Sequence, residues 1–161
     1  MIAISINNLK KEINKLRMDG KKIGLCIGVF DLLHPGHIKH LEEAKKMCDV
    51  LIVGLTSDKV TKKQKGLSRP IFKEETRSYM ISMIKSVDFV FIRSDYYATP
   101  SIRLIKPDFY IKGQDYANST DKYLLLGKKM VESVGGKLIF TKTGKFAEIR
   151  TSKIINKIDD K

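Results

Sequence analysis

Short apolar runs alternate with helix-patterned segments along almost the whole chain. The runs cover residues 22–30, 50–55, 87–92, 109–111 and 137–140. Each is short and rich in Ile, Val, Leu or Phe, as expected of strands that are buried on both faces of a sheet. Because helical segments separate the runs, the spacing predicts βαβ units and a doubly wound parallel sheet of about five strands in a three-layer α/β/α fold.

The segments between these runs place apolar residues at helical spacing. The expected helices cover residues 6–20, about 38–48, 73–85, a short stretch from residue 99, 124–134 and 151–158. The first is expected to pack on the sheet as an N-terminal helix within residues 1–20. A length of 161 residues suits one domain with its own core, which predicts a single domain over residues 1–161.

The chain contains no run of ~18 apolar residues and no basic segment ahead of a long apolar stretch, so neither a membrane span nor a secretory signal is expected. Its two cysteines, Cys26 and Cys48, lie in apolar-periodic segments. They are interpreted as small buried hydrophobes in a reducing compartment, with a reactive thiol as the alternative. The predicted location is the cytoplasm, without a membrane partner.

Positive charge is in excess, with 31 Lys and Arg against 18 Asp and Glu and a net charge of +13. Such an excess attracts phosphates, in nucleic acid, at an anionic membrane surface or in small phosphorylated substrates. A solvated lysine-rich surface accounts for most of it. Residues 59–69 are basic but contain no aromatic residue for base stacking, so a nucleic-acid-binding module is the less favoured class and nucleic acid is not an expected partner.

All three histidines lie within seven residues, directly after the first apolar run, at positions 34, 37 and 40. A strand that leads through Pro35 and Gly36 into a helix places free backbone N–H groups and a positive dipole end at the ligand edge of the sheet. Gly36 lets an anion approach the backbone, and His34 and His37 can both donate toward one point. The pattern predicts a triphosphate site with both rings facing the solvent, and a nucleotide complex in which both rings turn inward would contradict it.

Other interpretations of the histidines remain open. One ring could cap the helix, and His40 is expected on the helix surface. A metal site is disfavoured because the turn separates His34 from His37 and no further Cys or His converges on them. No metal ion held by protein ligands is therefore expected.

The segment Gly28-Val29-Phe30-Asp31-Leu32-Leu33-His34-Pro35-Gly36-His37 resembles the signature of the cytidylyltransferase-like nucleotidyltransferases, whose hallmark is His-x-Gly-His. Residues 65–71 followed by Arg77, together with 105–108, 111–116 and 134–137, resemble the heptose-1-phosphate adenylyltransferase branch. The resemblance extends from about Lys21 to the last helix. It implies a Rossmann-like fold and transfer of a nucleotidyl group.

What the resemblance implies can be assigned to residues. His34 and His37 bind and polarise the nucleotide phosphates, while an acceptor phosphate oxygen attacks the α-phosphorus and pyrophosphate leaves. The backbone at Val29 and Phe30 lines the nucleotide site. Asp31 orients the loop or a metal-bound water, or else only caps the turn. Mg²⁺ is expected, bound mainly through the NTP phosphates.

Basic residues from later segments complete the expected site. Lys65 is the expected basic residue that reaches the phosphates, and Arg69 and Arg77 are expected to bind an acceptor phosphate. The alternative for Arg77 is an ordinary surface charge on a helix. Lys112 and Asp115 fall at the ligand end of the fourth apolar run, near the base or the acceptor.

The last helix departs from the family pattern. A Ser-Thr-Thr or Ser-Thr-Ser triplet usually opens it and holds the β- and γ-phosphates, whereas this chain has Arg150, Thr151 and Ser152. Thr151 and Ser152 keep the chemistry of a helix start, and an arginine can bind phosphate. The change also leaves open a catalytically silent relative. Lys145-Phe146 stands where cytidylyltransferase branches often carry Arg-Thr.

The expected function is transfer of a nucleoside monophosphate from an NTP, with ATP favoured, to a phosphorylated sugar such as heptose 1-phosphate. The alternative is a CTP-dependent cytidylyltransferase that acts on glycerol 3-phosphate or another polyol phosphate. The expected partners are the NTP, the phosphorylated acceptor and a second copy of the chain, because relatives are often dimers.

Overall fold

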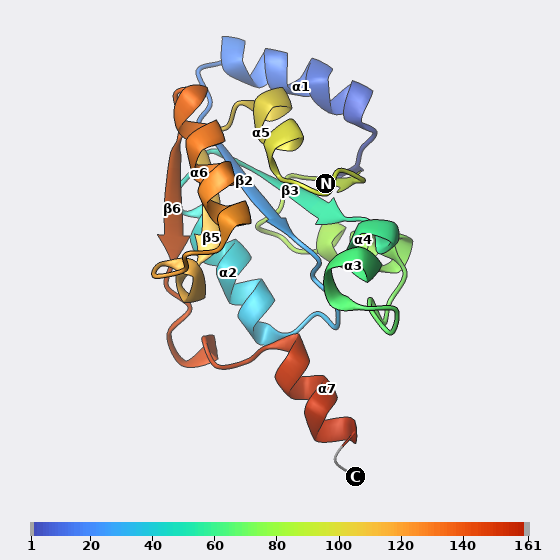
Figure 1. Ribbon diagram of the computed structural model, residues 1–161. Helices are drawn as coiled ribbons and strands as arrows, with labels where there is room; N and C mark the ends of the chain where they lie inside the picture. The colour runs from blue at the N-terminus through green and yellow to red at the C-terminus, as the bar shows by residue number, and fades with distance from the viewer. Residues whose placement is uncertain (1, 160–161) are drawn as a thin grey trace.

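A computed structural model describes residues 2–159, and its centre is a six-stranded parallel sheet with the strand order β1-β4-β3-β2-β5-β6 (Figure 1). The strands are β1 (Ile2–Ala3), β2 (Ile23–Gly28), β3 (Val50–Thr56), β4 (Phe89–Arg93), β5 (Phe109–Gly113) and β6 (Lys137–Thr141). The predicted doubly wound parallel sheet is confirmed. The additional strand, β1, has two residues and pairs with the edge of β4, too short a segment to produce a pattern in the sequence.

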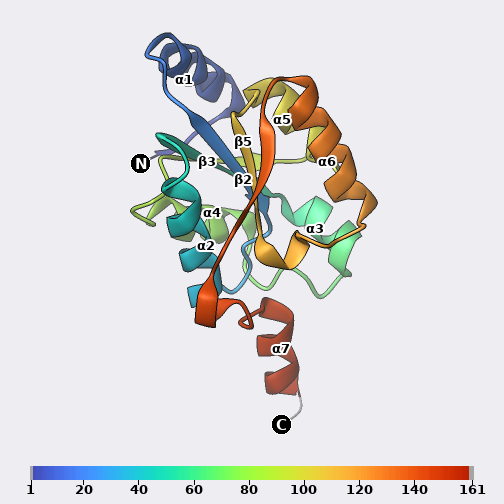
Figure 2. The ribbon, with the colours of Figure 1, turned by 90° about the vertical axis from the view of Figure 1, so that its left-hand side faces the viewer.

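Helices cover both faces of the sheet. They are α1 (Ile6–Met18), α2 (Pro35–Lys45), α3 (Asp58–Lys65), α4 (Glu74–Ser82), α5 (Thr99–Ile105), α6 (Lys122–Ser133) and α7 (Thr151–Asp159), with 3₁₀ turns η1 (Gln114–Tyr116) and η2 (Gly144–Phe146). Figure 2 shows α1, α5 and α6 on one face and α2 and α4 on the other. Sequence patterning did not predict α3, which begins where the Ser57 hydroxyl accepts a hydrogen bond from the Val60 amide.

Each face of the sheet has its own apolar core. Ile13 of α1, Ile102 of α5 and Val131 of α6 belong to the first core, and Leu41 of α2 and Ile81 of α4 belong to the second. The α1 helix is also joined to α5 by a hydrogen bond, because the Arg17 guanidinium donates to the Ile105 carbonyl at 2.8 Å. The N-terminal helix therefore packs on the sheet as expected.

The two cysteines are free thiols beside the second core. Cys26 is fully buried and Cys48 is half-buried. Burial raises the pKa of the Cys26 thiol and raises the pKa of Cys48 to about 11. Neither thiol is activated, in agreement with their interpretation as small hydrophobes.

The order of the strands reverses at β2. The chain passes from β2 to β3 and β4 on one side and then returns to place β5 and β6 on the other. Ligands of doubly wound sheets bind at such a switch point, outside the carboxyl ends of the strands. In this fold the switch point, and with it the expected ligand site, lies beyond Gly28 of β2 and Gly113 of β5. The structure also bears on membrane insertion. No helix within residues 2–159 is both long and apolar enough to cross a bilayer.

The last helix extends beyond this edge of the body (Figures 1 and 2). None of residues 151–158 is buried. A hydrogen bond of 2.8 Å joins the Thr151 hydroxyl of α7 to the backbone carbonyl of Asp31 in the loop after β2. The N-terminus of α7 is therefore close to the predicted site, although 120 residues separate the two in sequence.

Candidate phosphate-binding site

A tightly folded loop connects β2 to α2. Phe30 and Leu32 have positive φ angles of 50° and 46°, which side chains other than glycine adopt at an energetic cost. His34 then precedes Pro35, the first residue of α2. The His34 and His37 rings stack with their centroids 3.7 Å apart, and the Phe30 ring meets His37 edge-on at 5.3 Å. The two imidazoles thus form one pair at the carboxyl end of β2.

The histidine pair is enclosed rather than open. His34 is 8% exposed and His37 is half-buried. The Ile149 carbonyl oxygen, just before α7, lies so close to Gly36 that an added Cβ would stand 3.0 Å from it. The expectation of two solvent-facing rings is therefore wrong for His34, because the C-terminal segment folds over it.

Three ring nitrogens of this pair are buried without a hydrogen-bond partner among the residues that the structure describes: Nδ1 and Nε2 of His34 and Nδ1 of His37. Buried polar atoms without partners are rare, and each costs about 1–3 kcal/mol. In neutral imidazoles at most two of these three nitrogens carry an N–H, and those two are suited to donate to phosphate oxygens.

Burial also sets the charge of the pair. It lowers the pKa of His34, and together with the charges of His34, His40 and Lys65 it lowers the pKa of His37 to about 3. Both imidazoles are therefore neutral near pH 7. Each then carries one N–H donor, so the pair can bind phosphate oxygens without itself holding a positive charge.

His40 does not lie on the helix surface, contrary to expectation. It is half-buried, and its Nδ1 lies 2.7 Å from the hydroxyl of the fully buried Thr141 at the end of β6. Burial and the charge of Lys112 lower its pKa to about 4. The helical face of α2 that carries His40 turns toward the sheet, where the ring links α2 to β6.

Asp31 organises the loop around the site. Its side chain is 1% exposed and accepts hydrogen bonds from the Ile71 and Phe72 amides at 2.8 and 3.1 Å. Burial acts to raise the pKa of this carboxyl, but the two amides and the charge of Arg69 outweigh burial and lower it. The contacts favour the loop-orienting interpretation of Asp31 and occupy its oxygens.

Arg69 lies beside the same loop. Its Nε donates to Asp31 at 2.9 Å, and its Nη2 is also 2.9 Å from the carboxylate but makes no good hydrogen bond. The charge of Arg69 is therefore already partly neutralised. A contact between Arg69 and an acceptor phosphate stays a prediction.

Arg77 has a structural role in place of the predicted one. It is fully buried, and its guanidinium donates four hydrogen bonds, to the carbonyls of Phe72, Val29 and Thr56 and to the Asp58 carboxylate. These bonds leave it no reach toward a substrate. Both the acceptor-phosphate assignment and the surface-charge alternative are wrong, because the side chain points into the protein and ties three loops together.

Two lysines lie near the histidine pair. Lys65 ends α3, and although much of its side chain is exposed, burial around the ammonium and the charge of Arg69 lower its pKa. Lys112 of β5 donates from Nζ to the Ile27 carbonyl at 3.1 Å, with the Tyr116 ring centroid 4.8 Å away. Lys112 thus lies at the carboxyl ends of β2 and β5, and a contact between Lys65 and a phosphate stays a prediction.

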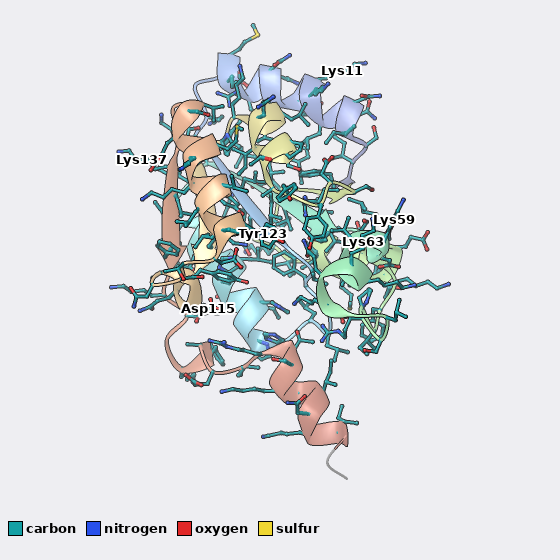
Figure 3. All side chains as sticks on the ribbon, viewed as in Figure 1. Lys11, Lys59, Lys63, Asp115, Tyr123 and Lys137 are labelled. Carbon is teal, nitrogen blue, oxygen red and sulfur yellow. The ribbon has the colours of Figure 1, made fainter. Side chains whose placement is uncertain are left out.

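The remaining predicted site residues lie either at the start of α7 or in the η1 turn after β5. Arg150, Thr151 and Ser152 stand at the start of α7, beside the loop that contains Asp31. Asp115 is exposed in η1, and its carboxylate folds back over Gly113, where a Cβ would overlap it. The structure therefore brings the start of α7 to the histidine loop. Asp115 stays exposed in the η1 turn after β5, where Figure 3 labels it.

The donor set does not fit a metal ion held by the protein. Within residues 2–159 no group of three or more His, Cys, Asp or Glu side chains could hold one. Asp31, the nearest buried carboxylate, is already saturated by amides and Arg69. A divalent cation at this site would depend on the oxygens of a ligand.

Sequence reasoning missed Arg93. This buried arginine ends β4, donates to the Thr56 hydroxyl at 3.2 Å and also donates to the backbone carbonyls of Asp95 and Tyr97. It thereby fixes the loop after β4. The available signal was an arginine directly after an apolar run, at the edge where loops carry function.

The structure is thus a doubly wound α/β protein with paired imidazoles and a helix N-terminus at its switch point, the place where such sheets bind their ligands. The family model described as cytidylyltransferase-like matches residues 25–157. The chain therefore belongs to the cytidylyltransferase-like family.

Similar proteins include the bifunctional protein HldE of Campylobacter jejuni strain RM1221, which is 41% identical over 97% of this chain and 32% of the relative. HldE of Desulfatibacillum aliphaticivorans is 37% identical over 95% of this chain and 30% of the relative. The chain thus spans about a third of the length of these curated relatives.

Two solved structures share the fold. The lipopolysaccharide core biosynthesis protein of Thermoplasma volcanium GSS1 has a TM-score of 0.64 and 30% identity, over 76% of this chain and 98% of that protein. The pantoate-beta-alanine ligase of Francisella tularensis has a TM-score of 0.63 over 100% of this chain and 78% of that protein. At 18% identity the ligase supports the fold alone.

Proposed function

We propose that this protein is a nucleotidyltransferase that transfers a nucleoside monophosphate from an NTP, with ATP favoured, to a phosphorylated sugar of the heptose 1-phosphate kind. Pyrophosphate leaves, and the activated sugar serves the synthesis of a surface polysaccharide. The observation that carries the proposal is the stacked histidine pair, with three buried nitrogens and no partners, at the switch point of the sheet. The similarity to HldE and to a lipopolysaccharide core biosynthesis protein supports the choice of acceptor.

The reaction needs positioning and charge neutralisation rather than a covalent intermediate. An oxygen of the acceptor phosphate forms the new bond to the α-phosphorus as the bond to pyrophosphate breaks. The neutral imidazoles of His34 and His37 donate N–H groups to the phosphate oxygens, and Lys65 and Lys112 supply positive charge. Val29, Phe30, Gly36 and Asp115 are proposed to line the nucleotide.

The C-terminal helix is proposed to hold the distal phosphates. The Thr151 hydroxyl holds the start of α7 against the loop of the histidine pair, and the first-turn amides, Ser152 and Arg150 are proposed to bind the phosphates there. The Ile149 carbonyl lies against Gly36, and the segment before α7 is proposed to shift when the triphosphate enters. In the same site Asp31 keeps the loop in place and Arg69 is proposed to meet the acceptor phosphate.

Mg²⁺ is proposed to arrive as part of the substrate, complexed to the NTP phosphates, since residues 2–159 offer no group of three or more His, Cys, Asp or Glu side chains for it. Removing the ion with a chelator is expected to abolish transfer and to leave the melting temperature of the nucleotide-free protein unchanged. A chelator-induced fall in that melting temperature would show a metal site in the protein itself.

We propose further that the chain is one domain, located in the cytoplasm, which acts as a homodimer without nucleic-acid or membrane partners. The free, unactivated cysteines support a reducing compartment. Ile158 of α7 is 65% exposed and supports an interface between copies. Sedimentation equilibrium tests the dimer, and a monomer at micromolar concentration would contradict it.

The second candidate is CTP-dependent transfer to glycerol 3-phosphate, which the cytidylyltransferase-like family makes the nearest rival. Pyrophosphate release separates the two candidates when ATP or CTP is combined with heptose 1-phosphate or glycerol 3-phosphate. We expect turnover with ATP and heptose 1-phosphate. Turnover with CTP and glycerol 3-phosphate alone would favour the rival.

The histidine pair is tested in the same assay. His34→Asn and His37→Asn are each expected to lower kcat by about 100-fold or more, the usual cost of a lost transition-state donor. His40→Asn is the matched control, one helical turn away, and is expected to keep most of the activity. Wild-type turnover in both His34→Asn and His37→Asn would refute the catalytic role of the histidine pair.

A further inference from the structure

Three tyrosine rings meet at the carboxyl edge of the sheet, outside the histidine site. Tyr96 and Tyr97 lie in the loop between β4 and α5, and Tyr123 lies in the first turn of α6. The ring centroids are 5.3 Å apart for Tyr96 and Tyr97, 5.7 Å for Tyr96 and Tyr123, and 5.6 Å for Tyr97 and Tyr123. Figure 3 shows Tyr123 between the ribbons of α6 and α3. We call these three residues the tyrosine cluster.

The protein holds the tyrosine cluster in a fixed position. The buried Arg93 donates to the backbone carbonyls of Asp95 and Tyr97, and the Gln64 side-chain amide donates to the Tyr96 carbonyl at 3.2 Å. Anchors from β4 and α3 thus fix the loop from two sides. Binding sites are built in this way, because a fixed side chain loses little freedom when a ligand arrives.

The rings nevertheless remain in contact with solvent. Tyr97 is 45% exposed and Tyr123 is 36% exposed, and neither ring belongs to either apolar core. A cluster whose only role was packing would hide these rings. Anchored aromatic rings that stay exposed beside a ligand edge are typical of a binding surface.

Positive charge borders the tyrosine cluster. Lys122 Nζ lies 5.2 Å from the Tyr123 ring centroid. A hydrogen bond with Tyr123 raises the pKa of the Tyr96 hydroxyl, and the charges of Lys122 and Lys63 oppose this shift. The nearby carboxylate of Asp121 accepts hydrogen bonds from the first amides of α6. The surface therefore combines apolar ring faces, phenol hydroxyls and ammonium groups, which together suit a ligand with hydroxyls and an anionic group.

The tyrosine cluster adjoins the proposed transfer site through α3. Gln64 binds the Tyr96 carbonyl, and the next residue, Lys65, is close enough for its charge to lower the pKa of His37. The end of α3 therefore contacts the tyrosine cluster and carries a charge that acts on the histidine pair. A molecule with its phosphate near Lys65 can extend its other end to the tyrosine cluster.

We propose that Tyr97 and Tyr123 form the subsite that recognises the ring of the acceptor, a cyclic sugar phosphate. This inference rests on the proposed function and adds to it the residues that select the acceptor. One face of a pyranose consists of C–H bonds and packs on aromatic rings, while the sugar hydroxyls reach the phenol hydroxyls and Lys122. Glycerol 3-phosphate has no ring face, so the tyrosine cluster selects against it.

Steady-state kinetics test the subsite. Tyr97→Leu and Tyr123→Leu are expected to raise KM for heptose 1-phosphate by about tenfold, as befits a lost aromatic contact. KM for ATP and kcat are expected to change less than about twofold. Tyr123→Phe keeps the ring and is expected to restore most of the acceptor affinity, which a variant that merely misfolds would not do.

Tyr79→Leu on α4 is the matched control, because Tyr79 is 64% exposed on the other face of the sheet. It is expected to leave the acceptor KM unchanged. The subsite is overturned if the cluster variants match Tyr79→Leu, or if they raise KM for ATP as much as KM for the acceptor.

A binding measurement separates the failure of this subsite from a failure of the proposed function. Saturation-transfer NMR with mannose 1-phosphate, without nucleotide, is expected to show transfer to the ring protons in the wild type and its loss in Tyr97→Leu and Tyr123→Leu. That result supports the subsite even if no pyrophosphate forms with any NTP. Absence of transfer in the wild type, or equal transfer in the variants, contradicts it.

Discussion

At the scale of single residues, burial decides what the polar side chains near the switch point can do. His37 and His40 have pKa values of about 3 and about 4, since they are covered by protein and face positive charges. The Arg77 guanidinium donates its hydrogen bonds to backbone carbonyls, although its position in the sequence suggests a phosphate ligand. Each residue type keeps its usual hydrogen-bonding chemistry, but the surroundings of the side chain decide whether it can bind a ligand or only stabilise the fold.

The depressed histidine pKa values predict acid sensitivity. The unfolded chain binds protons on His37 and His40 below about pH 6.5 whereas the folded protein does not, so folding stability is lost as the pH falls from that value toward the folded pKa values. Between about pH 7 and about pH 5.5 the loss is roughly 1 kcal/mol for each histidine. Urea unfolding at both pH values measures it.

The matched variants are His37→Asn and His40→Asn, each of which is expected to reduce the pH dependence whatever its effect at neutral pH. An unchanged pH dependence in both variants would show that neither histidine is neutral and buried.

Arg77→Met tests the structural role of this arginine. It leaves three carbonyls and Asp58 without their donor, so the free energy of unfolding is expected to fall by about 3–5 kcal/mol. Arg103→Met, on the exposed side of α5, is the control and is expected to change stability by less than about 0.5 kcal/mol. Intact stability together with a raised acceptor KM would instead support the phosphate role.

At the scale of elements, the C-terminal helix is the least anchored part of the site. Residues 151–158 contribute nothing to either core, and the Thr151 hydroxyl joins α7 to the Asp31 carbonyl. A helix held so lightly is free to move with the segment over Gly36, as the proposed entry of a triphosphate requires. Binding and the closing of the site are therefore expected to be coupled through α7.

Thr151→Val removes this hydrogen bond at constant shape. Since such a bond contributes about 1 kcal/mol, amide exchange in α7 is expected to become roughly fivefold faster. Hydrogen-exchange mass spectrometry of the C-terminal peptide measures the effect. Thr143→Val changes a threonine of the same segment outside this contact and serves as the comparison. Equal exchange in the two variants would mean that the hydrogen bond does not hold α7.

At the scale of the whole molecule, the net charge of +13 acts on stability as well as on substrates. Like charges repel in the compact state, and salt screens them over a Debye length of about 10 Å at 0.1 M. The same screening weakens attraction of an NTP. Stability and nucleotide affinity are therefore expected to respond to salt in opposite directions.

Raising NaCl from about 0.05 M to about 0.5 M is expected to raise the melting temperature of the free protein by roughly 3 °C and to increase the Kd for MgATP several-fold. Thermal-shift and calorimetric titrations measure the two effects. A melting temperature that falls with salt would show that attractive ion pairs outweigh the repulsion.

The strand runs and the His-x-Gly-His segment could be predicted from sequence, because both are local patterns. A strand buried on both faces has to be apolar along its length, as residues 50–55 are, and Pro35-Gly36 between two histidines predicts the start of a helix at the end of the strand. These patterns were sufficient for the doubly wound sheet, its ligand edge and the histidine pair.

The sequence by itself determined the order of strands and helices and the chemistry available at the edge of the sheet. Only the tertiary structure decided that Ile149 covers Gly36, that Arg77 is buried and that Tyr97 meets Tyr123. The physical reason is that burial and hydrogen-bond partners come from residues far apart in the chain. The local sequence around an arginine or a tyrosine does not show whether its side chain will meet solvent, a backbone carbonyl or a ligand.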